Sequence, residues 1–315
     1  MEKLVIGIDI GGTNTVFGLV DAHGKILAKD TVSTENFPLP EDFAAVVSEH
    51  VKKLFSSYAD KYEFIGAGIG APTGNFFSGC IEFAPNLKWK GIIPMAKYFS
   101  ERLGIRSLLT NDANAAALGE MLFGAAKEMK DFLFITLGTG LGSGIVVNGE
   151  LVYGHDGFAG ELGHVIVEKD GRQCGCGRKG CLETYCSATG IRRTYTDLLM
   201  SKHEKTSITG KVADAKYIFD KAMQGEQSAI DAFRITGEIL GLALANSVAY
   251  TSPEAIFLFG GLAQSGDLIF KPTIENFKKN LLHVYRKEIK ILPSQLKEND
   301  AAILGAASLI WKEIR

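Results

Sequence analysis

One short pattern occurs twice in the chain, and it limits the folds that the chain can adopt. An apolar strand, a Gly/Thr loop and two further strands follow one another near the N-terminus, and the same succession returns about 125 residues later. The first copy comprises residues 3–10, 11–13, 15–20 and 25–34, and the second comprises residues 132–137, 138–144, 145–147 and 150–152. Two copies are too few for a solenoid, but two similar domains facing one cleft would produce this pattern.

A strand, not a helix, follows the glycines of each loop. A P-loop or a dinucleotide-binding fingerprint needs a helix directly after its glycines, and the pattern G-x-x-x-x-G-K-[ST] is absent. Elsewhere helical and strand patterns alternate, which predicts α/β domains whose sheets are covered by helices. We expect helices near residues 41–59, 92–103, 113–123, 187–200, 211–223, 227–250, 267–281 and 300–314, and further strands near 64–70, 106–110, 255–259 and 288–292.

The length of 315 residues corresponds to roughly two domains at about 150 residues each. We expect an N-terminal domain over residues 1–115, a larger C-terminal domain over 116–298, and a terminal helix over 299–315 that packs back on the first domain. The net charge of −2 argues against non-specific binding to nucleic acid or to an acidic membrane surface. There is no apolar run of about 20 residues and no signal-peptide pattern at the start, so we expect a cytoplasmic protein.

The two Gly/Thr loops are candidates for binding phosphate groups. Backbone N–H groups of Gly11 and Gly12 can approach phosphate oxygens, and Thr13 adds a hydroxyl donor. Asp9 can hold Mg²⁺ through water, although a hairpin turn with a solvated carboxylate explains this segment equally well. The second loop strengthens the functional interpretation, because two loops can hold the β- and γ-phosphates from opposite sides. The pair Gly260-Gly261 follows a third strand and is a weaker candidate for the adenosine site.

Asn111 and Asp112 follow the predicted strand 106–110 and open a helix. A carboxylate in that place can act as the general base that takes a proton from a hydroxyl attacking phosphorus. An ordinary helix N-cap explains the same residues, and from this segment alone capping is the better interpretation.

Three of the five cysteines and one histidine form the strongest chemical motif. His164, Cys174, Cys176 and Cys181 supply three thiolates and one imidazole, which is a closed tetrahedral set for structural zinc. A chance cluster of thiols is the alternative. Cys174 and Cys176 are separated by one residue, so a generic zinc ribbon with C-x-x-C does not fit. Neither Cys80 nor Cys186 has a function that the sequence indicates.

These motifs together resemble the ROK family (repressors, open reading frames and sugar kinases) along essentially the whole chain. The segments that carry the resemblance are Asp9-Ile-Gly-Gly-Thr13, Asn111-Asp112, Gly138-Thr-Gly-Leu-Gly142, Glu161-Leu-Gly-His164 and Cys174-Gly-Cys-Gly-Arg-Lys-Gly-Cys181-Leu-Glu183. The resemblance implies duplicated actin/Hsp70/hexokinase-like (ribonuclease H-like) α/β domains around a central cleft, with a small zinc module. It also implies an enzyme that uses ATP and Mg²⁺ to phosphorylate a free hexose at its 6-hydroxyl group.

The resemblance assigns roles to individual residues. Asp112 would be the catalytic base. The sugar ligands would be Gly74, Asn86, Asn111, Asp112, Glu161, His164 and Glu183, and the nucleotide and its Mg²⁺ would be bound by Asp9, Gly11, Gly12, Thr13, Asn14, Gly138, Thr139, Gly140, Gly260 and Gly261. His164 would place one ring nitrogen on the zinc and the other near the sugar, because a metal-bound imidazole has a fixed tautomer and orientation.

The sugar-binding loop departs from the family pattern. Glucose kinases of this family often have Gly-x-Pro-Gly, whereas residues 70–75 here read Gly-Ala-Pro-Thr-Gly-Asn, with one more residue before the second glycine. Glucose is the expected substrate, and fructose, allose, N-acetylglucosamine and N-acetylmannosamine are the alternatives, because single groups distinguish these sugars and the shape of the pocket selects among them.

Two further classes compete with the kinase. A ROK repressor carries a helix-turn-helix domain before this core, whereas here the first strand is expected to begin by Lys3. The net charge of −2 also gives no indication of the basic surface that DNA binding needs. A sugar-sensing pseudokinase would lack its catalytic groups, whereas Asp9 and Asp112 are both present. We expect hexose and ATP as small-molecule partners, no nucleic-acid or membrane partner, and, from the resemblance, a homodimer.

Overall fold

The computed structural model describes residues 1–201, 214–285 and 289–314, which fold into two compact units. Unit 1 comprises Met1–Met129, Glu150–Gly160 and Ser294–Arg315, and unit 2 comprises Lys130–Gly149 and Glu161–Pro293. The domain limits inferred from the sequence, at residues 115 and 298, stay a prediction.

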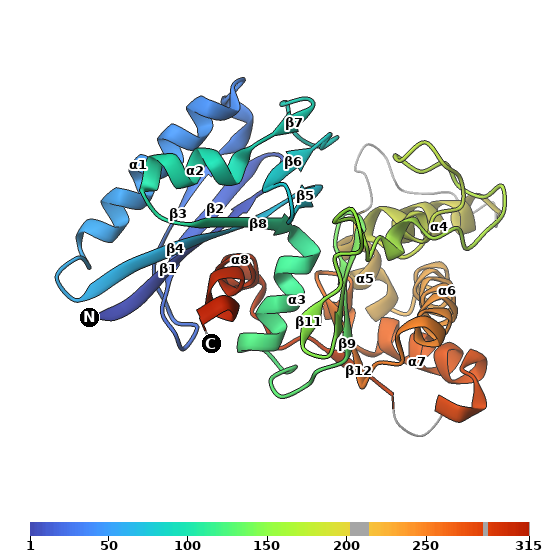
Figure 1. The fold of residues 1–315 in the computed structure, drawn as a ribbon. Helices are drawn as coiled ribbons and strands as arrows, with labels where there is room; N and C mark the ends of the chain where they lie inside the picture. Colours follow the sequence, from blue (N-terminus) through green and yellow to red (C-terminus); the bar gives the residue numbers. More distant parts are fainter. Residues whose placement is uncertain (202–213, 286–288, 315) are drawn as a thin grey trace. The chain divides into compact units, whose positions relative to one another are not determined.

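Unit 1 contains a five-stranded sheet in the order β3-β2-β1-β4-β8 (Figure 1). Its strands are β1 (Glu2–Ile10), β2 (Asn14–Val20), β3 (Ile26–Ser33), β4 (Tyr62–Ala71) and β8 (Ser107–Asn111). The first three strands form an antiparallel meander, while β4 and β8 run parallel to β1. The carboxyl ends of β1, β4 and β8 therefore meet at one edge of the sheet, which is where α/β sheets usually bind their ligands.

Two pairs of helices cover the faces of this sheet (Figure 1). Helices α1 (Pro40–Ser56) and α2 (Met95–Leu103) lie on one face, and α3 (Asp112–Phe123) and α8 (Glu298–Ile314) lie on the other. Pro40 occupies the first turn of α1, and the apolar stripe Phe43, Val47 and Val51 is fully buried against the sheet. Gly68 allows α8 to approach β4, because a β-carbon there would lie 1.8 Å from the Ala306 carbonyl oxygen.

Unit 2 repeats the topology. The second sheet has the order β11-β10-β9-β12-β13, which is the order of the first sheet with its strands renumbered. Its strands within unit 2 are β9 (Phe132–Leu137), β10 (Leu141–Val147), β12 (Ala255–Phe259) and β13 (Lys290–Pro293), while the two-residue edge strand β11 (Glu150–Leu151) begins a segment that belongs to unit 1. The duplicated α/β architecture predicted from the repeated Gly/Thr pattern is thus confirmed.

The helices of unit 2 share one hydrophobic core with its sheet. These helices are α4 (Ala188–Ser201), α5 (Ala215–Met223), α6 (Gln227–Thr251) and α7 (Asp267–Asn280). Unit 2 also has the short 3-10 helices η2 (Leu162–His164), η3 (Leu182–Thr184), η4 (Ala263–Ser265) and η5 (His283–Tyr285), whereas η1 (Thr34–Asn36) lies in unit 1. Phe233 and Leu240 of α6 pack in the same buried cluster as Ile135 of β9 and Ile256 of β12. None of the helices in the described ranges combines the length and the apolar character needed to cross a bilayer.

Some predicted elements differ from the structure. The second Gly loop is shorter than expected, because β10 begins at Leu141 and pairs back to β9. The helix expected from residue 92 begins at Met95, since Pro94 stops the segment before it from being helical. A small sheet was not predicted: it consists of β5 (Gly74–Asn75), β6 (Cys80–Glu82) and β7 (Ile92–Ile93). The predicted starts of the helix at 211 and of the strand at 288 lie outside the described residues.

Candidate functional site

The carboxyl edge of the first sheet gathers most of the candidate residues of unit 1. Asp9 of β1 is paired with Gly70 of β4, and Gly70 in turn with Thr110 of β8. A β-carbon at Gly70 would lie 3.3 Å from the Asp9 carboxylate and 3.8 Å from Cα of Asp112. The absence of a side chain at Gly70 therefore leaves the space between the two carboxylates open, a role that the sequence analysis did not assign to this residue.

The structure assigns the helix cap, one of the two interpretations of this segment, to Asn111. Asn111 is the N-cap of α3, and its Oδ1 accepts hydrogen bonds from the backbone N–H groups of Ala113 (2.8 Å) and Asn114 (3.2 Å). Asp112 is the first residue of the helix, and its Oδ1 accepts from the backbone N–H of Ala113 at 2.8 Å. The amide nitrogen of Asn111 and the second carboxylate oxygen of Asp112 are not used by the cap.

The electrostatics of the two carboxylates favour protonation. Burial, and secondarily the charge of Asp112, raise the pKa of Asp9 from 3.8 to about 7. Desolvation by the surrounding protein atoms also raises the pKa of Asp112, against the opposing effect of its hydrogen bond from the Ala113 backbone. The Asp112 side chain nevertheless remains accessible to solvent at one side. A reachable carboxylate with a raised pKa is a suitable general base.

The predicted sugar loop lies at the same edge of the sheet. Gly74 is packed against β8, since a β-carbon on it would lie 2.4 Å from the Thr110 carbonyl oxygen. Thr73, the extra residue of this loop, adopts a positive φ of 49°, which is unusual for a β-branched side chain, and its buried hydroxyl lacks a hydrogen-bond partner among the described residues. The departure from the family pattern is thus a conformationally strained position.

The first Gly loop turns tightly between β1 and β2. The backbone N–H of Gly11 donates to the Asn14 carbonyl at 3.0 Å, and Thr13 accepts from the backbone N–H of Thr34 at 2.8 Å. Gly12 packs against the backbone of Asn86, because a β-carbon at Gly12 would lie 2.7 Å from the Asn86 carbonyl oxygen. Asn86 therefore lies beside the phosphate-loop candidate, a contact that its assignment as a sugar ligand did not anticipate.

The second Gly loop occupies the equivalent place in unit 2. Gly138 donates its N–H to the Gly140 carbonyl at 3.1 Å and accepts from the backbone N–H of Ala188 at 2.9 Å. Gly260 follows the parallel strand β12 and packs on the end of β9, with a β-carbon position 2.8 Å from the Leu137 carbonyl oxygen. The loop 138–140 and Gly260 thus lie side by side at the carboxyl edge of the second sheet. Thr139 lies in that loop, and Gly261 follows Gly260 directly.

The four residues of the predicted metal site come together in unit 2. The ligand atoms of His164, Cys174, Cys176 and Cys181 all lie within 4.8 Å of one another. Cys176 and Cys181 place their sulfur atoms 3.6 Å apart, and Nδ1 of His164 lies 3.7 Å from the Cys174 sulfur. Four ligands around zinc at Zn–S distances of about 2.3 Å have sulfur–sulfur separations of about 3.8 Å, so the donor set fits this ion.

Two glutamates flank His164. Oε2 of Glu161 lies 3.9 Å from Nε2, and Oε1 of Glu183 lies 3.7 Å from Nδ1. Nδ1 therefore faces the cysteines, whereas Nε2 faces the Glu161 carboxylate. Glu183 also accepts a hydrogen bond from the Cys174 thiol at 2.9 Å, and a β-carbon at Gly140 would lie 2.9 Å from its other oxygen. Glu183 thus connects the cysteine cluster with the second Gly loop.

Arg178 gives this cluster a positive charge. Although burial acts in the opposite direction, hydrogen bonds from the Arg178 backbone and guanidinium group lower the pKa of Cys176 to about 6. Arg178 also donates to the His164 carbonyl at 2.6 Å. A thiolate that forms easily near neutral pH suits metal binding, because zinc is bound by the deprotonated sulfur.

The structure therefore assembles the predicted site residues in two groups, each within its own unit. Asp9, the first Gly loop, Gly74, Asn86, Asn111 and Asp112 belong to unit 1; the second Gly loop, Glu161, His164, Glu183, the three cysteines and Gly260-Gly261 belong to unit 2.

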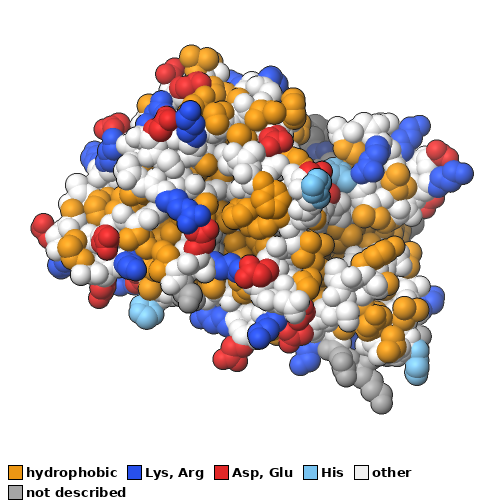
Figure 2. Space-filling view, viewed as in Figure 1, with side chains coloured by type: hydrophobic (Ala, Val, Ile, Leu, Met, Phe, Trp, Pro, Cys, Tyr) orange, Lys and Arg blue, Asp and Glu red, His pale blue; other side chains and the backbone are white. Residues whose placement is uncertain are grey.

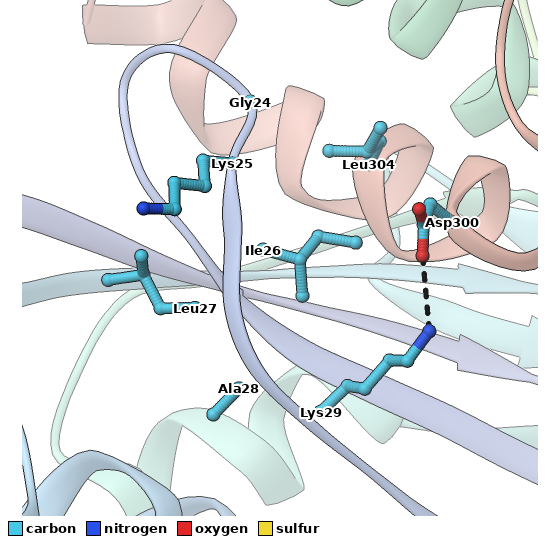
Figure 3. A pocket seen from close by; sticks show the side chains of 8 residues that line it. All are labelled: Gly24, Lys25, Ile26, Leu27, Ala28, Lys29, Asp300 and Leu304. Carbon is cyan, nitrogen blue, oxygen red and sulfur yellow. Dashed lines mark hydrogen bonds and ion pairs between the residues drawn. The ribbon is translucent and has the colours of Figure 1, made fainter.

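A groove elsewhere on unit 1 is separate from these groups. It has a volume of about 530 Å³ and lies along β3, with Leu304 of α8 on one side and an ion pair between Lys29 and Asp300, at 3.2 Å, across it (Figure 3). None of the residues that line it was predicted as a site residue.

The surface charges are mixed. On the face drawn in Figure 2, basic and acidic side chains are interspersed between apolar and neutral ones, and no field of one sign extends over it. This distribution matches the nearly balanced composition, 34 basic and 36 acidic residues.

Two sheets of the same strand order, each with a glycine loop at its carboxyl edge, define a duplicated α/β protein of the actin/Hsp70/hexokinase-like class. The model of the ROK family matches residues 5–313, and the chain therefore belongs to the ROK family. A glucokinase from Thermotoga maritima is 37% identical over 100% of this chain and 99% of that protein.

Two solved structures are similar over almost the whole chain. A ROK family glucokinase from Streptomyces griseus, in complex with glucose and AMPPNP, is 34% identical with a TM-score of 0.79, covering 97% of this chain and 98% of that one. A ROK hexokinase from Thermus thermophilus is 28% identical with a TM-score of 0.84, covering 99% of both chains.

Proposed function

We propose that this chain is an ATP-dependent hexokinase of the ROK family that phosphorylates glucose at its 6-hydroxyl group. Relatives named glucokinase at 33 to 37% identity over nearly the full chain support this activity. The observation that carries the chemical assignment is the position of Asp112, which opens α3 at the carboxyl edge of the first sheet and keeps one carboxylate oxygen outside the helix cap.

Asp112 acts as the general base. It accepts the proton of the sugar hydroxyl while the oxygen of that hydroxyl attacks the γ-phosphorus of ATP and the bond to the β-phosphate oxygen breaks. Its raised pKa makes it a stronger base than an exposed aspartate, and the adjacent Asn111 is free to donate its amide N–H to a neighbouring sugar hydroxyl. Both side chains are oriented by the same helix terminus, so the base and the sugar are positioned together.

Asp9 supports the metal ion of the nucleotide. Its carboxylate lies at the end of β1 beside Gly70, and oxygen ligands of this kind suit Mg²⁺ held through water. When bound, Mg²⁺ neutralises charge on the β- and γ-phosphate oxygens. The pKa of about 7 for Asp9 belongs to the metal-free protein, since a nearby cation favours the ionised carboxylate.

The glycine loops supply backbone donors to the phosphates. Residues 11–14 and 138–140 each form a tight turn after the first strand of their sheet, where backbone amides can approach anionic oxygens closely. Gly260 and Gly261 extend the second loop along its sheet edge and would receive the adenosine.

The zinc module orients sugar ligands and takes no part in the chemistry. His164, Cys174, Cys176 and Cys181 would occupy all four positions of the ion, which leaves none for substrate or water. Nδ1 of His164 would then be fixed on the metal, so Nε2 and the carboxylates of Glu161 and Glu183 can bind hydroxyl groups of the hexose. Asn86 and Gly74 complete the proposed sugar contacts.

The cytoplasm, where ATP and reduced thiols are available, is the compartment that we propose for this reaction. A homodimer stays a prediction from the family resemblance.

Coupled ATP turnover with a panel of hexoses tests the activity and its substrate. We expect glucose to give the highest kcat/KM among glucose, fructose, allose, mannose and the N-acetylated hexosamines. Asp112→Asn should reduce kcat by at least about 100-fold, which is the lower end of the rate enhancement that a general base usually contributes. The affinity for glucose should be largely retained. Asp60→Asn, which alters an exposed carboxylate in the turn after α1, is the matched control and should leave kcat unchanged. Full activity of Asp112→Asn would refute the base assignment, and an absence of ATP turnover with every hexose would refute the function.

A further inference from the structure

Glu120 is buried in a place that the proposed chemistry does not use. It lies on α3, two turns after Asp112, and among the described residues it is the one charged side chain with no accessible surface. Burying a carboxylate is costly unless hydrogen bonds replace its lost hydration. The groups that donate hydrogen bonds to Glu120 therefore indicate its structural role.

The Glu120 carboxylate accepts three hydrogen bonds from two distant parts of the chain. Oε1 accepts from the backbone N–H groups of Ala125 (2.8 Å) and Gln295 (3.2 Å), and Oε2 accepts from the Ser294 hydroxyl at 2.5 Å. The Ser294 oxygen in turn accepts from the backbone N–H of Leu296 at 3.2 Å. We call Glu120, Ala125, Ser294 and Gln295 the Glu120 clasp; all four belong to unit 1.

The partners of Glu120 lie at two of the places where the chain leaves or re-enters unit 1. Ala125 precedes the passage from Met129 to Lys130, and Ser294 is the first residue after the return at Pro293. The main-chain oxygen of Glu120 also accepts from Gly124 (3.0 Å) and Ala126 (3.3 Å), and Ala126 accepts from Met129 at 3.0 Å. A continuous set of hydrogen bonds thus runs from Glu120 to the last residue before the first passage.

The helices on both sides of the clasp are closely packed. A β-carbon at Gly305 of α8 would lie 2.8 Å from the Ala115 carbonyl oxygen of α3, and one at Gly119 would lie 3.0 Å from Cα of Gly305. The backbones of α3 and α8 are therefore in close contact, with Asp112 at one end of α3 and the clasp near the other. Two of the four segments that connect unit 1 with unit 2 are therefore tied to the helix that carries the base.

We infer that Glu120 is a positioning residue for phosphoryl transfer, because it holds two of the four chain connections to unit 2, those after Met129 and before Ser294, in the frame that carries Asp112. This inference rests on the proposed function. If the two groups of site residues must come together around the sugar, loosening the clasp lowers the fraction of molecules competent to bind. Apparent affinity falls by the same fraction, so KM for the hexose should change more than kcat.

Four variants test the clasp in the full-length zinc-loaded protein. Glu120→Ala removes all three side-chain hydrogen bonds and should raise KM for glucose about tenfold, with kcat within about threefold of wild type. Ser294→Ala removes the hydrogen bond that its hydroxyl donates to Glu120 and the one that this oxygen accepts from Leu296, and it should raise KM several-fold. Glu120→Gln should stay near wild type, since its amide oxygen still accepts from both N–H groups and its NH₂ can donate to Ser294.

Ser308→Ala is the matched control. Ser308 is a fully buried serine on α8 whose hydroxyl donates to the Leu304 carbonyl at 2.7 Å, away from the clasp. It should lower Tm about as much as Ser294→Ala while leaving KM unchanged. If Ser308→Ala raises KM equally, or if folded Glu120→Ala retains the wild-type KM, the positioning role is refuted. Should Glu120→Ala fail to fold, the comparison of the two serine variants decides.

A second measurement does not depend on activity. Hydrogen exchange should quicken in segments 124–129 and 294–297 of Glu120→Ala and Ser294→Ala, and not in Ser308→Ala. Unchanged exchange in both segments would refute the clasp itself. Wild-type protein without hexose-dependent ATP turnover would instead refute the proposed function, so the two failures are distinguishable.

Discussion

The charge state of Asp9 should make the stability of the protein depend on pH. Burial, and then the nearby charge of Asp112, raise its pKa from 3.8 to about 7, so the folded protein binds the proton more tightly than the unfolded chain does. Without Mg²⁺, the free energy of unfolding should therefore fall as the pH rises from about 4 to about 7, by up to about 1.4 kcal/mol per pH unit, and then level off.

Urea denaturation at several pH values in the presence of EDTA measures this slope. Asp9→Asn cannot ionise and should give a flatter profile, with greater stability than wild type at pH 8. Mg²⁺ and an ATP analogue should reduce the slope in wild type by favouring the ionised carboxylate. An identical slope in Asp9→Asn would show that other groups cause the pH dependence.

The start of helix α3 combines two functions that substitution can separate. Asn111→Ala removes the cap and should cost about 1 kcal/mol of stability as well as sugar affinity. Asn111→Ser keeps an oxygen acceptor for the N–H groups of the first turn but loses the amide donor, so its Tm should stay close to wild type while KM for glucose rises about tenfold. A normal KM in Asn111→Ser would restrict Asn111 to capping.

We expect the segment from Glu161 to Cys186 to need the proposed zinc ion for its structure, because few of its residues lie in regular structure beyond η2 and η3. Cys176→Ser should lose bound zinc, measured by atomic spectroscopy, and should raise KM for glucose by at least about tenfold, since His164 is no longer held. Cys80→Ala, a thiol in unit 1, is the control and should retain one zinc per chain. Active wild-type protein without zinc would contradict the assignment.

At the scale of the whole molecule, the sequence predicted the repeated sheets because each meander carries strong apolar runs and a distinct Gly/Thr break. It also predicted that the side chains of His164 and the three cysteines lie close together, because three thiolates and one imidazole are a typical ligand set for zinc. Sheet β5-β6-β7 was missed, because strands of two or three residues are too short to show a period of two. The role of Glu120 was missed for another reason.

Apart from Asp112 at its first position, Glu120 is the one acid in the alanine-rich helix α3, and this isolation was the one indication that the sequence offered. Its hydroxyl partner Ser294 lies 174 residues further along, and nothing local to either residue pairs them. Likewise, Asn86 was predicted as a sugar ligand from its motif, whereas its contact with Gly12 depends on how two loops meet. Long-range pairings of this kind follow from the fold and not from local patterns.

The two units have separate hydrophobic cores, one built on β1 and β4 and the other on β9 and β12. Separate cores can unfold independently, so calorimetry of the ligand-free protein should show two transitions. Glucose together with an ATP analogue should raise both transition temperatures, because ligands that bind only the folded state add about 2.7 kcal/mol at 100 times Kd. A single two-state transition without ligand would contradict the independent unfolding of the two cores.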